Sequence, residues 1–78
     1  MIKAIIIDDE KAIREDLNQK IEAYFTDAIN VVAKVGSVKE GTLAIDMHKP
    51  DLVLLDIELE DGTGFDLLKQ IQHKMMSK

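Results

Sequence analysis

Three runs of apolar residues along the chain predict strands. Residues 2–7 are almost continuously apolar and rich in isoleucine, and residues 52–55 are Leu-Val-Leu-Leu. A continuous apolar run is typical of a strand that is buried on both faces of a parallel sheet, because a strand with one solvated face would alternate. The third run, Val31–Val35, is interrupted by Lys34, which suits a strand at the edge of a sheet.

Three other stretches carry apolar residues at the spacing of an amphipathic helix: residues 11–25, 37–49 and 65–76. The second starts with a capping box, in which the Ser37 hydroxyl and the Glu40 carboxylate satisfy backbone donors, and the proline that follows it stops the helix. The positions expected to face the core are Ile13, Leu17, Ile21 and Tyr24 or Phe25 in the first helix, Val38, Leu43, Ala44 and Met47 in the second, and Phe65, Leu68, Ile71 and Met75 or Met76 in the third.

These strands and helices alternate along the chain in the order βαβαβα, with an acidic loop at residues 58–64 before the last helix. Short alternating units imply right-handed crossovers, and therefore an α/β fold with a parallel sheet covered by helices. Such sheets bind ligands beyond the carboxyl ends of their strands.

The composition excludes several classes of protein. The 78 residues include no cysteine, so there is no disulfide framework, thiolate zinc site or cysteine nucleophile. Ten lysines and arginines against fifteen aspartates and glutamates give a net charge of -5, which disfavours direct binding to nucleic acid or to an anionic membrane. The apolar runs are too short to span a membrane and no signal peptide fits, so we expect one small domain in the cytoplasm.

Aspartates directly follow two of the predicted strands. Asp8 and Asp9 come after the first strand, and Asp56 comes after the third. Three carboxylates at one edge of a sheet would repel one another unless a cation neutralises them, and Mg²⁺ prefers oxygen ligands. A carboxylate beside such an ion can act as a nucleophile and accept a phosphoryl group as an aspartyl-phosphate.

Other interpretations of these acids stay open on the residues alone. Asp8 or Asp9 by itself is more often the N-cap of a helix. The acids from Asp56 onward suggest a calcium loop, but the sixth and twelfth positions of an EF-hand would here be aspartate and leucine. A metal-dependent phosphatase of the haloacid dehalogenase type would need Asp-x-Asp after its strand, whereas this chain has glutamate at position 58.

The remaining polar residues of note are expected to be solvated. The side chains of Glu58, Glu60 and Asp61 belong to the acidic loop, and His48 and His73 lie on polar helix positions without an evident partner. None of these side chains is expected to bind a ligand.

Three motifs occur in this chain together. An apolar strand ends in the pair Asp8-Asp9, a second strand reads Leu52-Val53-Leu54-Leu55-Asp56, and Asp56-Ile57-Glu58-Leu59 is followed by Gly64-Phe65-Asp66-Leu67-Leu68. Over essentially its whole length the chain therefore resembles the receiver domain of two-component response regulators, with its metal-binding pair, its phosphoacceptor strand, and the loop and third helix that follow.

The resemblance implies a flavodoxin-like fold with strand order 2-1-3-4-5, Mg²⁺ as cofactor and a histidine kinase as phosphoryl donor. Carried over by position, Asp56 is the phosphoacceptor, Asp9 a direct metal ligand and Asp8 a ligand through a metal-bound water. Glu58 contributes its backbone carbonyl to the ion. Glu60 departs from the family, which often has proline there. Because this chemistry is self-directed, the resemblance implies a signalling switch and not an enzyme.

A receiver also has a fourth strand that supplies a Ser or Thr hydroxyl and a fifth that supplies a lysine for the phosphoryl group. We therefore expect residues 1–78 to be the N-terminal part of a receiver domain, missing the last two βα units and impaired in phosphorylation. Residues 52–55 would then form an apolar sheet edge, which predicts a homodimer or swapped oligomer.

The amino-acid sequence of the loop after Asp56 is similar to that of receivers joined to LytTR-type DNA-binding output domains. The resemblance therefore implies such a domain as a partner. The alternative function is a non-phosphorylated assembly or dimerisation module derived from a receiver domain.

Overall fold

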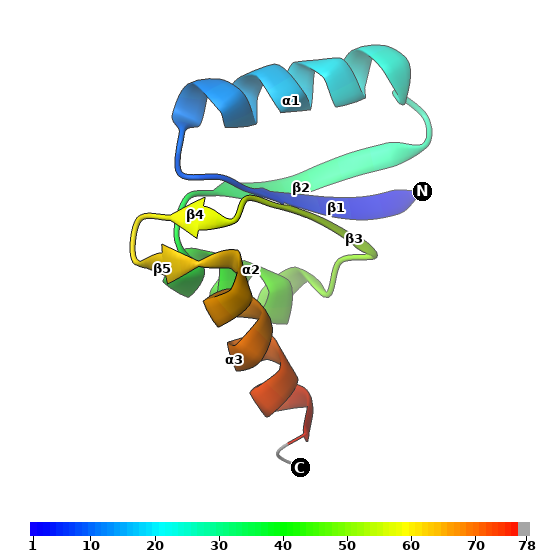
Figure 1. The fold of residues 1–78 in the computed structure, drawn as a ribbon. Helices are drawn as coiled ribbons and strands as arrows, with labels where there is room; N and C mark the ends of the chain where they lie inside the picture. Colours follow the sequence, from blue (N-terminus) through cyan, green and yellow to red (C-terminus); the bar gives the residue numbers. More distant parts are fainter. Residues whose placement is uncertain (77–78) are drawn as a thin grey trace.

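The structure is a computed structural model that describes residues 1–76, with side chains as far as Gln72. Its elements in chain order are β1 (Ile2–Ile7), α1 (Lys11–Tyr24), β2 (Ile29–Val35), α2 (Val38–His48), β3 (Leu52–Leu55), β4 (Glu58–Leu59), β5 (Gly62–Thr63) and α3 (Gly64–Met76). Figure 1 shows a central sheet with α1 on one face and α2 and α3 on the other. The predicted α/β class and the order of the six main elements are confirmed. No helix in the described part of the chain is both long and apolar enough to cross a membrane.

The sheet is parallel and has the strand order β2-β1-β3. The central strand β1 is the apolar run identified in the sequence, and Ile5, Ile6 and Ile7 are fully buried because helices cover both of its faces. β2 lies at an edge, as Lys34 indicated, but it begins two residues earlier than predicted because Ile29 pairs with Ile2. The sheet therefore has the order that a doubly wound fold requires around its first strand.

The β3 strand is less buried than its sequence predicts. All four of its residues are partly exposed, although an apolar run suggested burial on both faces. Among residues 1–76, β3 pairs only with β1, so its other edge lies open. The prediction of an apolar sheet edge is thus confirmed within the described residues, and the prediction of full burial is wrong.

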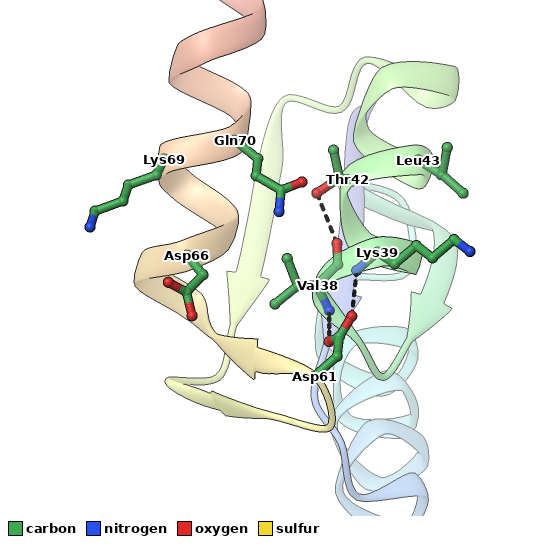
Figure 2. Close-up of a pocket in the computed structure, with 8 residues that line it drawn as sticks. All are labelled: Val38, Lys39, Thr42, Leu43, Asp61, Asp66, Lys69 and Gln70. Carbon is green, nitrogen blue, oxygen red and sulfur yellow. Dashed lines mark hydrogen bonds between the residues drawn. The ribbon is translucent and has the colours of Figure 1, made fainter.

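The N-terminus of α2 is capped from two directions. Ser37 Oγ accepts a hydrogen bond from the Glu40 N–H at 3.0 Å, which confirms half of the capping box. The Glu40 carboxylate accepts from the Ser37 hydroxyl at 3.2 Å and not from a backbone donor. The Val38 and Lys39 N–H groups instead donate to the carboxylate of Asp61, at 2.6 and 3.1 Å (Figure 2). All three N–H groups before the first intrahelical bond are therefore satisfied.

The acidic loop before α3 is partly ordered as a hairpin, since β4 and β5 pair antiparallel. Leu59 on β4 is buried in the core, and Thr63 caps α3 by accepting from the Asp66 N–H at 3.1 Å. Asp66 Oδ2 accepts in return from the Thr63 N–H at 2.9 Å, which makes a second capping box. The acidic loop predicted for residues 58–64 therefore contains four strand residues that were not predicted.

The predicted core faces of α2 and α3 are partly wrong. Leu43, Met47, Phe65 and Leu68 are all more than half exposed, whereas Leu67 is fully buried. Val38 and Ala44 are buried as predicted, and together with Gly41 and Thr42 they form the buried face of α2.

Gly41 explains why Leu43 and Met47 do not belong to the buried face of α2. A Cβ atom on Gly41 would lie 2.6 Å from Leu67 Cδ1 and 2.9 Å from Ile7 Cδ1, so these side chains occupy the space that a larger residue would fill. The glycine lets α2, α3 and β1 approach closely. The large residues Leu43 and Met47 then lie on the solvent side.

The core face of α1 is confirmed only in the middle of the helix. Ile21 is buried and Leu17 is half-buried, whereas Ile13, Tyr24 and Phe25 are exposed. His48 is half-buried, not fully solvated as expected. The expectations for the side chains of His73, Met75 and Met76 lie outside the described side chains.

Candidate metal and phosphoacceptor site

The register of the sheet brings the three aspartates together. Ile7, the last residue of β1, pairs with Val35 of β2 and with Leu55 of β3, so the three strands end level with one another. The next residues continue the pairing for one more bond, because the Asp8 N–H donates to Val35 O at 3.0 Å and the Asp56 N–H donates to Ile7 O at 2.9 Å. Asp8 and Asp56 therefore leave adjacent strands side by side.

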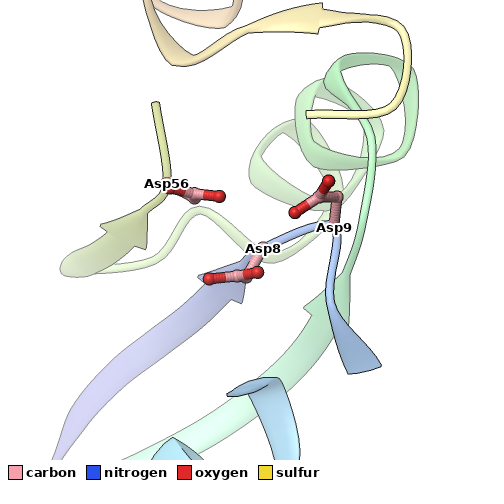
Figure 3. A group of neighbouring side chains, drawn as sticks. All are labelled: Asp8, Asp9 and Asp56. Atoms are coloured by element: carbon pink, nitrogen blue, oxygen red, sulfur yellow. The ribbon is translucent and has the colours of Figure 1, made fainter. Parts of the chain in front are cut away.

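Carboxylate oxygens of Asp8, Asp9 and Asp56 all lie within 4.8 Å of one another. Figure 3 shows the three side chains converging on one space beyond the ends of β1 and β3. Asp8 and Asp56 are half-buried, whereas Asp9 is exposed. The sequence predicted this cluster, and the structure brings all three predicted carboxylates together.

Local hydrogen bonds fix the orientation of two of these carboxylates. Asp8 Oδ1 accepts from the Glu10 N–H at 2.9 Å, and Asp56 Oδ1 accepts from the Ile57 N–H at 2.8 Å. The Arg14 guanidinium donates to the backbone carbonyl of Asp8 and braces the turn between β1 and α1. Each of these two aspartates keeps a second carboxylate oxygen that can face the space between them.

The alternative of an N-cap role for Asp8 or Asp9 does not hold. Glu10 is the residue at the N-cap position of α1, and no side chain caps the helix there. The EF-hand alternative fails as well, because its twelfth position is the fully buried Leu67 inside α3. Neither Asp8 nor Asp9 therefore serves as the cap of α1.

The donor set suits a hard divalent cation. Three carboxylates within this distance repel one another, and a bound cation relieves that repulsion. Mg²⁺ takes oxygen ligands, usually one or two carboxylates with several waters, and the exposure of Asp9 leaves room for such waters. The residues present thus fit the predicted ion.

Glu58 lies two residues after Asp56, at the first position of β4, and its side chain is exposed. Its backbone carbonyl follows the cluster closely in sequence, and its assignment as a metal ligand stays a prediction.

Two hollows on the surface of the molecule are relevant to the placement of the site. One, of about 330 Å³, is lined in part by Asp8, Leu17 and Asp56.

The larger hollow, of about 620 Å³, is a groove between α2 and α3 (Figure 2), and none of its lining residues belongs to the carboxylate cluster. We place the chemistry at the cluster, because only the cluster combines converging carboxylates with the carboxyl ends of the strands.

Asp61 has a structural role that its sequence context does not indicate. It was expected to be a solvated loop acid, but its carboxylate binds two N–H groups of α2. The hydrogen bond from the Val38 N–H is the main cause that lowers the pKa of Asp61 from its ordinary value of 3.8. No local sequence pattern reveals a cap that comes from more than twenty residues away, so only the folded chain shows this role.

The sequence comparison decides the family. The response regulator receiver domain family matches residues 4–77 of the 78. This chain belongs to that family. The receiver domain resembles the sensory transduction protein LytT of Enterococcus faecalis, with 38% identity over 69 residues that cover 88% of this chain and 28% of LytT. It also resembles the DNA-binding transcriptional activator DevR/DosR of Mycobacterium tuberculosis, with 31% identity over 96% of this chain and 34% of that protein.

Solved structures agree with the assignment. A DNA-binding response regulator of the LuxR family from Staphylococcus aureus superposes with a TM-score of 0.84 at 25% identity, over 97% of this receiver chain and 62% of that chain. The anti-anti-sigma factor PhyR of Bartonella quintana, solved in complex with the anti-sigma factor NepR, gives a TM-score of 0.78 at 31% identity, over 94% of this chain and 29% of PhyR. The chain spans about a third of the length of the curated relatives named above. The flavodoxin-like fold implied by the resemblance is confirmed.

Proposed function

We propose that this receiver domain accepts a phosphoryl group on Asp56 from a histidine kinase, with Mg²⁺ held by Asp8, Asp9, Asp56 and the backbone carbonyl of Glu58. The observation that carries the proposal is the convergence of three carboxylates within 4.8 Å at the ends of β1 and β3. Asp56 is proposed as the nucleophile because it matches the phosphoacceptor position of the family; like Asp8 it is half-buried at the end of a strand with one oxygen held by a backbone N–H.

In the proposed transfer, an Asp56 carboxylate oxygen attacks the phosphorus of a phosphohistidine. The new P–O bond forms as the P–N bond breaks, and the imidazole leaves with the electron pair and takes up a proton. Mg²⁺, when bound, offsets the negative charge that collects on the phosphoryl oxygens. Asp8 and Asp9 supply the carboxylates that hold such an ion beside Asp56. Because the acceptor is the protein itself, the proposal includes no turnover of a separate substrate.

The proposed partners follow from the same assignment. A histidine kinase is the proposed phosphoryl donor. An output domain receives the signal, and we propose a DNA-binding one because the relative DevR/DosR is a DNA-binding transcriptional activator. In this proposal residues 1–78 form the N-terminal part of the receiver domain, and the system works in the cytoplasm. The net charge of -5 supports an indirect role at DNA and not direct binding by this domain.

Phosphoryl transfer from a small phosphodonor tests the site. The chain is incubated with acetyl phosphate and Mg²⁺, and intact mass spectrometry counts the added phosphoryl groups. We expect slow addition of no more than one group to the wild type, no addition to Asp56→Asn, and no addition when a chelator removes the metal. Asp27→Asn is a matched control, because Asp27 is an exposed acid far along the chain from the cluster.

Modification of Asp56→Asn at the wild-type level would refute the assignment of the nucleophile. The rate of labelling by acetyl phosphate tests the expected impairment. Rapid and stoichiometric labelling of these 78 residues would contradict it.

A second function, self-association, is favoured by the open edge of β3. Alternate residues of a strand direct their N–H and C=O groups to opposite sides, and the Asp56 N–H points to β1, so Val53 and Leu55 direct theirs to the open edge. Ile57, Phe65 and Leu68 are each more than half exposed, and all three line a small hollow beside Leu55. An open apolar edge of this kind favours pairing with another copy.

Light scattering after size exclusion tests this second function. We expect the average mass to rise towards that of a dimer as the protein concentration increases, and Phe65→Asp to shift the equilibrium to the monomer. Ile13→Asp is the control, since Ile13 is an exposed apolar residue on the opposite face of the sheet. A monomer mass that is independent of concentration would exclude the dimer.

A further inference from the structure

The hairpin that follows Asp56 is attached at its tip to the start of α2. The Asp61 carboxylate accepts from the Val38 and Lys39 N–H groups, as Figure 2 shows. Next to it, a Cβ atom on Gly62 would lie 3.2 Å from Val38 Cγ2, so the backbone of the hairpin packs directly against the helix. The tip therefore rests on α2 through both hydrogen bonds and van der Waals contact.

A second contact places the same tip over the turn between β2 and α2. Glu60 Oε1 lies 3.4 Å from the position that a Cβ atom on Gly36 would take. Gly36 is buried, and Arg14 Nη1 and Asp8 O also lie close to that position, so the Glu60 side chain is one of three groups beside the turn from β2 into α2. Asp61 therefore attaches the tip of the hairpin to the start of α2, and the Glu60 side chain lies near the turn that precedes it.

The other end of the hairpin is attached at the carboxylate cluster. The Asp56 N–H is bonded to β1, and the Ile57 carbonyl accepts from the Gly64 N–H at 2.7 Å, which closes the base of the hairpin. A Cβ atom on Gly64 would lie only 2.7 Å from the backbone oxygen of Asp56, so the start of α3 also presses on this base. Glu58 lies between the fixed base and the fixed tip.

We propose that Asp61 is a positioning residue for the metal site, because its bonds to α2 hold the hairpin and so set where the Glu58 backbone carbonyl lies relative to Asp56. This inference rests on the proposed function, in which that carbonyl is a metal ligand. Residues that orient a ligand without touching the metal commonly change metal affinity by a factor of about 10 or more. By linkage, a bound ion also strengthens the bonds from Asp61 to α2.

Two variants separate position from charge. Asp61→Ala removes both bonds to α2, whereas Asp61→Asn removes the charge but keeps one oxygen that can accept an N–H. If position matters, metal affinity falls in the order wild type, Asp61→Asn, Asp61→Ala. If only the charge matters, the two variants lose the same affinity. Asp27→Ala is a control for the loss of an exposed acid.

Binding of Mn²⁺, followed by the electron paramagnetic resonance signal of the free ion, gives the affinities. We expect Asp61→Ala to raise the Kd about tenfold, Asp61→Asn to raise it less, and Asp27→Ala to leave it unchanged. Circular dichroism establishes that each variant is folded under the conditions used, and Asp61→Asn carries the test if Asp61→Ala does not fold. Hydrogen exchange supplies a readout that a purely structural role would not change: addition of Mg²⁺ should slow exchange of the Val38 and Lys39 amides in the wild type.

Equal Kd values for the wild type and both Asp61 variants would overturn the positioning role while leaving the metal site intact, and so would equal losses in the two variants. Absence of Mn²⁺ binding by the wild type would overturn the proposed metal site, and this inference with it. The two failures are therefore distinguishable by the wild-type titration alone.

Discussion

The neighbouring leucines Leu67 and Leu68 on α3 offer a direct test of how this receiver domain packs. Leu67 is fully buried against Ile7 and the backbone of Gly41, whereas Leu68 is 52% exposed. The stripe predicted from the sequence, which runs through Phe65 and Leu68 at helical spacing, assigns the opposite roles. The same substitution at the two positions therefore distinguishes the observed packing from the pattern.

The structure sets the expected magnitudes. Leu67→Ala should lower the free energy of unfolding by about 3 kcal/mol, within the range of roughly 2–5 kcal/mol for a buried leucine. Gly41 has no side chain that could move into the cavity, so the loss should not be small. Leu68→Ala removes a side chain that is only half-buried, so its cost should be about 1 kcal/mol. The helix propensity change is the same in both variants and cancels in the comparison.

Urea unfolding followed by far-ultraviolet circular dichroism gives the two free energies of unfolding. If Leu67→Ala has no folded baseline, the pair Leu67→Val and Leu68→Val replaces it, with a smaller but still unequal loss. Equal losses at the two positions, or a larger loss at Leu68, would refute the packing described above.

Two further predictions concern the caps of α2. Ser37→Ala should cost about 1 kcal/mol, measured by the same urea unfolding, because it leaves the Glu40 N–H without its acceptor; an unchanged midpoint would contradict this. The lowered pKa of Asp61 makes its contribution to stability fully present above its ordinary value of 3.8 and lost as the pH falls through the folded-state value. The stability difference between the wild type and Asp61→Asn should therefore narrow below that pH, whereas a constant difference would argue against the bonds to α2.

Some parts of this fold could be predicted from the sequence because they depend on short apolar runs. The central strand β1 is apolar at every position from Ala4 to Ile7. A continuous apolar run of this kind is typical of a strand that is buried on both faces of a parallel sheet. The helix faces were harder to predict, because α3 carries two apolar stripes. Phe65 with Leu68, and Leu67 with Ile71, both satisfy helical spacing, and only the space next to a glycine on another helix selects the second pair.

The carboxylate cluster could be predicted even though those faces were not, because the two depend on different features of the chain. Asp8 and Asp56 are placed by the register of β1 with β3, which pairs Ile7 with Leu55. A rotation of α2 or α3 about its own axis changes which leucine is buried but leaves that pairing unchanged. Asp61 is different, since its bonds to Val38 and Lys39 require both the hairpin and the start of α2 to be in place. It follows that variants of Leu67 should affect stability throughout the domain, whereas variants of Asp61 should affect chiefly the proposed metal site and the start of α2.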